Sequence, residues 1–314
     1  MRDPNDTPTT VEDRREHRRL RIRRHGRRAM IRSIYSLPSL ATLGNAVCGF
    51  GAMYVASLDA KSIDPLAQYF LGRNFEIAAY LIFAAMVFDA LDGRLARFAR
   101  HTTDFGGQLD SLADVISFGA APAFLALLVF KAHFPWSDDS PLGVTRAVWA
   151  IGALYMSCAA IRLARFNVSN EHGEQAHFSF LGLPSPGAGA AVAAFVLMQQ
   201  DLHHQAIAHN SAVLSAMSQA CVYALPVVVC GTGLLMVSAI RYPHLVNRYL
   251  RGRRSFVRVI GVFVILLLLV VAHKYTIAIG SLLYAFGALG MWAYNRARRT
   301  SSAVASLPSS DQPK

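Results

Sequence analysis

The sequence has few charged residues for its length. Only 16% of its 314 residues are Asp, Glu, Lys or Arg, whereas an ordinary soluble domain has about 25%. Hydrophobic residues make up 54% of the chain, and runs of about 20 such residues are long enough to cross a bilayer as helices. This composition argues against a soluble globular enzyme and predicts an all-α integral membrane protein.

Cysteine is also scarce. The four cysteines lie inside apolar stretches and none belongs to a Cys-x-x-Cys pair, so the sequence indicates neither a disulfide framework nor a zinc site. Three histidines, His203, His204 and His209, lack the H-E-x-x-H arrangement of a zinc-binding helix. We expect these histidines to lie in a solvated loop on the outer side of the membrane.

Eight apolar windows follow a polar, arginine-rich segment at residues 1–34. They cover residues 35–58, 75–97, 107–131, 146–166, 184–200, 213–240, 256–273 and 275–296. Each is about long enough to span a bilayer, so the sequence predicts about eight transmembrane helices. The fifth window is only mildly hydrophobic, although its small residues favour close helix packing in a membrane. We therefore expect a basic tail at 1–34, one transmembrane domain at 35–296 and a C-terminal tail at 297–314.

Positive charge is unevenly distributed among the connecting segments. Of the 31 Lys and Arg residues, 26 lie in residues 1–34, 94–100, 162–165, 241–258 and 296–314. Cytoplasmic loops are enriched in Lys and Arg, so the sequence predicts that both termini lie on the cytoplasmic side of the inner membrane. Topology also accounts for the net charge of +12 without nucleic-acid binding.

Four aspartates, Asp89, Asp92, Asp110 and Asp114, flank one predicted cytoplasmic turn. An Asp at the centre of a spanning helix costs about 2.5–3.5 kcal/mol, so such residues need partners or a wet cavity. The i,i+3 and i,i+4 spacings place each pair on one helix face, and the short loop makes the two helices antiparallel neighbours. Facing carboxylates suit Mg²⁺ or Mn²⁺, and two such ions can assist phosphoryl transfer. The alternative is an Asp/Arg network that only holds two helices together.

Small residues alternate with these aspartates. Gly93, Ala96 and Gly106 leave room for a phosphate-bearing ligand to approach the backbone, and the Arg97 guanidinium suits phosphate oxygens. Buried carboxylates also occur in ion or solute transporters, but there we expect them near mid-membrane, whereas these flank a turn. The residues therefore favour metal-assisted phosphoryl transfer, with a transporter as the alternative.

The pattern D-x-x-D-G-x-x-A-R-x8-G-x3-D-x3-D, from Asp89 to Asp114, resembles the signature of the CDP-alcohol phosphatidyltransferases. The resemblance implies a six-helix core, a homodimer, and transfer of the phosphatidyl group of CDP-diacylglycerol to a small alcohol with release of CMP. It also implies that the four aspartates hold two divalent ions and that Asp114 accepts the alcohol proton. The residues implied to bind the CDP moiety within this pattern are Gly93, Ala96, Arg97 and Gly106.

Further stretches look like the phosphatidylserine synthase branch of this family. They are residues 37–45, 109–122, 162–167 and 182–186. They imply L-serine as the acceptor, with glycerol phosphate or inositol as alternatives. In the first stretch Ser39 replaces an Asn common among relatives, while Thr42 and Asn45 remain candidate contacts near the cytidine. Because the serine carboxylate needs a cation and its hydroxyl must approach Asp114, the candidate acceptor-binding residues are Ser117, Arg162 and Arg165.

Overall fold

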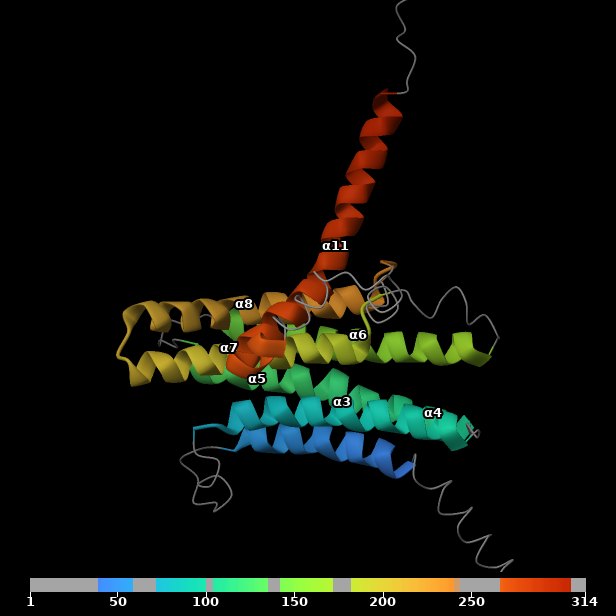
Figure 1. The fold of residues 1–314 in the computed structure, drawn as a ribbon, viewed down its shortest axis with the longest axis horizontal. Coiled ribbons are helices and arrows are strands. Elements are labelled where there is room, and N and C mark those ends of the chain that lie inside the picture. Colours follow the sequence, from blue (N-terminus) through green and yellow to red (C-terminus); the bar gives the residue numbers. More distant parts are fainter. Residues whose placement is uncertain are drawn as a thin grey trace, which may run out of the picture.

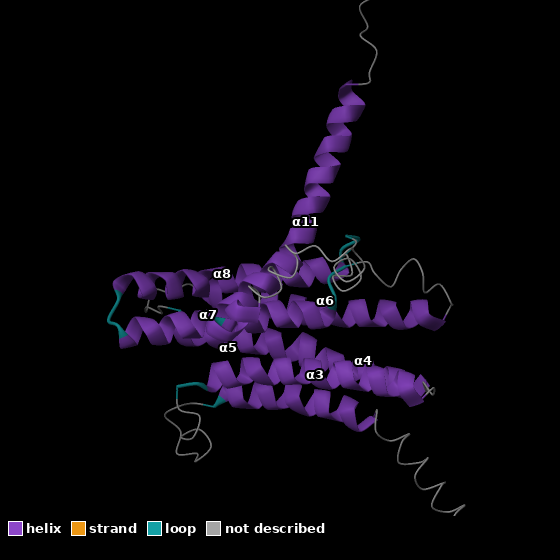
Figure 2. Cartoon of the chain, in the orientation of Figure 1, coloured by secondary structure: helices purple, strands orange, loops and turns teal. Residues whose placement is uncertain are grey.

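The computed structural model describes residues 39–58, 72–99, 104–134, 142–171, 182–240, 242 and 266–305. Within these ranges the regular secondary structure is entirely helical (Figures 1 and 2). This confirms the predicted all-α architecture. The main helices are a first helix at Ser39–Ser57, then α3 (Asn74–Ala99), α4 (Asp104–Asp114), η1 (Val115–Ala120), α5 (Ala121–His133), α6 (Leu142–Glu171), α7 (Ser185–Ala208), α8 (Ala212–Val237) and α11 (His273–Ala305). Residues 266–271 are also helical.

Six helical segments in the described part of the chain are long and apolar enough to cross a membrane. They are Ser39–Ser57, Asn74–Leu95, Phe105–His133, Gly143–Val168, Ala212–Val237 and His273–Asn295, and each coincides with one of the eight predicted windows. The fifth window forms α7, which is not among the six. The seventh window, 256–273, lies partly outside the described residues, so the total of eight spans stays a prediction.

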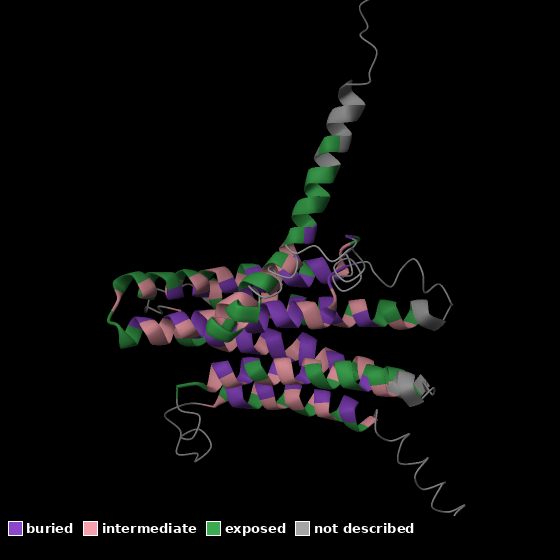
Figure 3. Ribbon diagram, viewed as in Figure 1, coloured by how far each residue is buried: buried purple, intermediate pink, exposed green. Residues whose placement is uncertain are grey.

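The fifth window forms α7, whose side chains pack mostly against protein. A mildly hydrophobic helix is therefore suitable at this position. Residues 188–197 of α7 are all buried, and most of them are Ala, Gly or Val. α7 packs against α3, α8 and α11, and Figure 3 shows the buried residues gathered in the middle of the bundle. A Cβ atom at Gly189 would lie 3.5 Å from the Phe118 Cα atom, so this small residue lets α7 approach η1 closely.

The third span contains a π-helical segment, η1, between α4 and α5. Pro122 has no N–H group and cannot donate the usual α-helical hydrogen bond to the Phe118 carbonyl. The Tyr155 hydroxyl of α6 donates to that carbonyl at 3.0 Å instead. Tyr155 and Phe118 are both fully buried. A proline and a distant tyrosine therefore stabilise a local widening of the helix.

Polar residues at the end of the bundle away from the aspartates form a network between α3, α7 and α11. Lys274 Nζ lies 3.1 Å from Glu76 Oε1 and 2.8 Å from Asp201 Oδ1, and His204 Nδ1 lies 3.1 Å from Glu76 Oε1. The His203 ring contacts His133 edge to face. The expectation of a solvated loop is therefore wrong for His203 and His204, because both lie in α7 and contact neighbouring helices.

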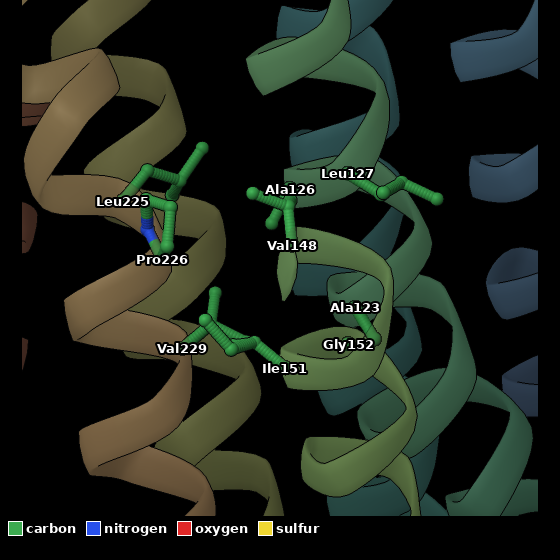
Figure 4. A pocket seen from close by; sticks show the side chains of 9 residues that line it. All are labelled: Ala123, Ala126, Leu127, Val148, Ile151, Gly152, Leu225, Pro226 and Val229. Carbon is green, nitrogen blue, oxygen red and sulfur yellow. The ribbon is translucent and has the colours of Figure 1, made fainter. Parts of the chain in front are cut away.

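A small cavity lies between α5, α6 and α8 (Figure 4). Its volume is about 10 Å³, roughly the space for one water molecule, and a water also needs polar partners. The lining side chains are apolar, and they include Pro226, which interrupts the hydrogen-bond ladder of α8. This cavity is a packing gap beside a proline and is too small for a substrate.

Candidate functional site

The aspartates of the predicted pattern come together at one end of the bundle. Asp89 and Asp92 lie in the C-terminal half of α3, and Asp110 lies in α4. One carboxylate oxygen from each of these three residues lies within 4.8 Å of the other two. The prediction that the acidic faces of the two helices meet is confirmed for these three residues.

These three carboxylates fit a divalent cation. At about 5 Å, two carboxylates repel by about 3 kcal/mol at the effective dielectric typical near a protein surface. The Asp92 Oδ2 and Asp110 Oδ1 atoms are buried and have no hydrogen-bond partner. Buried anionic oxygens without partners are costly, and hard oxygen ligands in this number suit Mg²⁺ or Mn²⁺. The cluster can therefore hold a metal ion, and a cation would remove the repulsion.

Asp114 lies one helical turn beyond Asp110 and is not part of the three-residue group. Its side chain is buried, and its Oδ1 atom accepts a hydrogen bond from Asn45 Nδ2 at 3.0 Å. Arg162 of α6 is close enough to interact electrostatically with it. Asp114 thus lies between the carboxylate cluster and the cation of α6, where a proton acceptor for a small alcohol would be needed.

The first helix supplies two polar residues to this end of the bundle. Thr42 and Asn45 are buried on the same face, and the Thr42 side chain hydrogen-bonds with Asp92. A Cβ atom at Gly49, one turn further along, would lie only 2.7 Å from the Ser117 Cα atom. Glycine at this position therefore lets the first helix approach η1 closely enough for Asn45 to reach Asp114.

The residues predicted to bind CDP are only partly described. Gly93 is exposed, and a Cβ atom there would meet nothing within 4 Å, so a ligand can approach its backbone. Gly106 is half-buried near the start of α4. Ala96 and Arg97 belong to α3, but their side chains lie outside the described part of the structure. Contacts of these four residues with a nucleotide stay predictions.

The three candidate acceptor-binding residues have different environments. Arg162 Nη1 donates a hydrogen bond to the Ser185 hydroxyl at 3.1 Å, while its Nε atom is buried without a partner. Arg165 is exposed on α6. Ser117 is fully buried and donates its hydroxyl hydrogen to the Asn45 carbonyl at 2.8 Å. Arg162 is therefore the best placed to bind an anion, whereas Ser117 joins two helices.

Sequence reasoning did not single out several residues around Arg162 and Asp110. Ser185, the first residue of α7, is buried beside Arg162. Asn167 Nδ2 donates to the Ser111 hydroxyl at 3.0 Å and so joins α6 to α4 next to Asp110. Both serines and Asn167 belong to the stretches that resemble the phosphatidylserine synthase branch. That resemblance was the available signal for them.

Comparisons with known proteins agree with this geometry. A profile of the family described as CDP-alcohol phosphatidyltransferase matches residues 35–228. The chain is 32% identical over 214 residues to the CDP-diacylglycerol--serine O-phosphatidyltransferase of Helicobacter pylori, covering 68% of this chain and 74% of that protein. It is 30% identical to the Bacillus subtilis protein of the same name, covering 66% and 90%. With the protein of that name from Methanocaldococcus jannaschii it shares 32% identity, covering 54% and 64%.

Proposed function

Because the chain belongs to the CDP-alcohol phosphatidyltransferase family, we propose that it transfers the phosphatidyl group of CDP-diacylglycerol to L-serine. The products are phosphatidylserine and CMP. The observation that carries this proposal is the meeting of Asp89, Asp92 and Asp110 beside a buried Asp114. The names of the curated relatives favour serine over glycerol phosphate or inositol as the acceptor.

Asp114 is the proposed general base. Asn45 donates to one carboxylate oxygen of Asp114, which fixes the side chain and leaves the other oxygen to accept the serine hydroxyl proton. The serine oxygen then attacks the phosphorus that carries diacylglycerol. The bond from that phosphorus to the CMP oxygen breaks, and CMP leaves.

The proposed metal ligands are Asp89, Asp92, Asp110 and Asp114, and the proposed cofactor is a pair of Mg²⁺ or Mn²⁺ ions. The support is the close approach of three carboxylates and the two buried oxygens without partners. When bound, such ions stabilise negative charge on the phosphates and on departing CMP. The CDP moiety is proposed to contact Thr42, Asn45, Gly93, Ala96, Arg97 and Gly106.

Arg162 is proposed to bind the serine carboxylate. Its buried Nε atom has an unused N–H group, and the start of α7 beside it favours negative charge through the helix dipole. Arg165, one turn away on α6, adds positive charge to the same region. Ser117 contributes by holding the carbonyl of Asn45. An acceptor without a carboxylate, such as choline, would leave Arg162 unpaired and should react poorly.

The catalytic end is proposed to face the cytoplasm, as the distribution of Lys and Arg predicts. Single cysteines at Thr102 and Asp138, in a variant without the four native cysteines, test this orientation on intact cells. An impermeant thiol reagent should label the cysteine at position 138 and not the one at 102. The family resemblance also leads us to propose a homodimer. The mass of the protein in detergent shows whether it is a monomer or a dimer.

The decisive experiment is an acceptor panel with purified protein. CDP-diacylglycerol and Mg²⁺ or Mn²⁺ are supplied, and CMP release is measured with L-serine, glycerol 3-phosphate, inositol or choline. We expect release with serine and much less with the others. CMP release that requires glycerol 3-phosphate or inositol and does not respond to serine would support the same reaction with a different acceptor. Absence of release with every alcohol would favour a transporter.

A further inference from the structure

A helix outside the family match packs against the proposed acceptor region. The match ends at residue 228, whereas α11 begins at His273. α11 contacts α7, and its C-terminal part projects away from the other helices (Figure 1). Tyr284 of α11 lies against Gly187, in the first turn of α7. A Cβ atom at Gly187 would lie 3.2 Å from Cε1 of Tyr284.

Two further contacts fix the place of Tyr284. The Tyr242 hydroxyl donates a hydrogen bond to the carbonyl of Ala285 at 2.8 Å, and Tyr242 is buried. The rings of Tyr242 and Tyr284 pack with their centroids 5.6 Å apart. Tyr242 therefore fixes the position of α11 at Ala285, where the neighbouring Tyr284 ring lies over the start of α7.

Tyr284 also lies near Arg162. The two side chains are close enough to interact electrostatically, and Arg162 donates to Ser185, two residues before Gly187. The ring and the guanidinium group therefore approach the same turn of α7 from different helices. Tyr284 is half-buried, which is suitable for a residue that borders a site open to a small solute.

We propose that Tyr284 is a positioning residue that holds Arg162 in place for the acceptor, so that serine binding depends on α11. This inference rests on the proposed function. It assigns to the C-terminal part of the chain a role in acceptor binding rather than in binding the lipid donor. The aspartates proposed to hold the metal ions and the donor belong to α3 and α4, whereas Tyr284 belongs to α11, which packs mainly against α7.

The first test separates the two substrates. Tyr284→Ala should raise the KM for serine by about tenfold while the KM for CDP-diacylglycerol stays within about twofold of the parent. Tyr284→Phe keeps the ring and should change the KM for serine by less than about threefold. Tyr294→Ala is the matched control, since Tyr294 is an exposed tyrosine on the same helix. An effect of Tyr284→Ala no larger than that of the control would overturn the inference, as would an equal rise in both KM values.

The second test uses the contact between Gly187 and Tyr284. Gly187→Ala should push the ring aside by a few tenths of an ångström and raise the KM for serine. In a Tyr284→Ala background the added methyl group meets no ring, so Gly187→Ala should then have no effect on that KM. Additive effects of the two substitutions would overturn the inference. Gly187→Ala removes no side chain, so it carries the test if Tyr284→Ala fails to fold.

The parent protein distinguishes this inference from the proposed function. A parent that releases no CMP with serine contradicts the proposed function itself. A parent that is active with serine, combined with a Tyr284→Ala variant of unchanged KM for serine, contradicts only the role of Tyr284. Thermal unfolding in detergent shows whether each variant is folded before its kinetics are compared.

Discussion

Replacing Gly49 with Ala should separate the first helix from the catalytic aspartate. The new Cβ atom would lie 2.7 Å from the Cα atom of Ser117, whereas carbon atoms in contact are about 3.5–4.0 Å apart. The opposing atom is backbone and cannot rotate away, so the helix must move by about 1 Å. Overpacking of this kind costs about 1–3 kcal/mol of stability.

The same movement would weaken a hydrogen bond at the site. Asn45 lies one turn before Gly49 on the first helix, and its bond to Asp114 is 3.0 Å long. A shift of about 1 Å takes this distance to about 4 Å, beyond the range of a hydrogen bond. Misplacing a catalytic group by about 1 Å can cost about 100-fold in rate. We therefore expect Gly49→Ala to lower both the unfolding temperature in detergent and the rate of CMP release.

A second glycine on the same helix provides the control. A Cβ atom at Gly51 would lie 3.8 Å from Cδ1 of Leu81, an ordinary contact, so Gly51→Ala should keep turnover within about twofold and gain up to about 1 kcal/mol of helix stability. Ser117→Ala should not rescue Gly49→Ala, because the Cα atom of residue 117 remains. If turnover recovers in that double variant, the contact with the Ser117 backbone is not the cause of the loss. Parent-like turnover of Gly49→Ala alone would contradict the same reasoning.

Three other substitutions test separate parts of the structure. Asp114→Asn should lower CMP release by about 10²-fold or more and leave a folded protein; residual turnover within about tenfold would remove it as the base. Tyr155→Phe should lower the unfolding free energy by about 1–3 kcal/mol, because it leaves the buried Phe118 carbonyl without a donor; an unchanged unfolding temperature in detergent would contradict this. Lys274→Ala should destabilise the protein by about 3 kcal/mol, because Glu76 is then buried without its lysine. Adding Glu76→Gln to Lys274→Ala should recover part of the lost stability, because the buried side chain is then uncharged.

The acidic cluster was predictable because its evidence is local. A spacing of three or four residues places Asp89 and Asp92 on one face and Asp110 and Asp114 on another, and a short connection makes the two helices neighbours. The structure brings three of the four side chains together as expected. The bond from Asn45 to Asp114 joins residues 69 positions apart, and only the family resemblance pointed to Asn45.

The surroundings of Ser117 were only partly predictable from helical periodicity. Periodicity places Ser117 on the face of Asp110 and Asp114, and the structure agrees for Asp114, because Ser117 and Asp114 both form a hydrogen bond with Asn45. The π-helical geometry of η1 was not predicted, and the Phe118 carbonyl within it accepts a hydrogen bond from Tyr155, which lies 37 residues away. Periodicity describes one helix at a time, so it does not contain such a contact.

Charge compensation differs between the two ends of the bundle. Glu76 and Asp89 are both on α3, 13 residues or about 20 Å apart along the helix. Glu76 has Lys274 and His204 as partners within 3.1 Å, so the protein itself supplies the opposing charge there. At the other end, Asp92 and Asp110 each retain a buried oxygen without a hydrogen-bond partner. Burying such groups costs stability unless a cation compensates them. The carboxylates that the protein pairs internally are therefore structural, and those it leaves unsatisfied are the ones available to a metal ion and substrate.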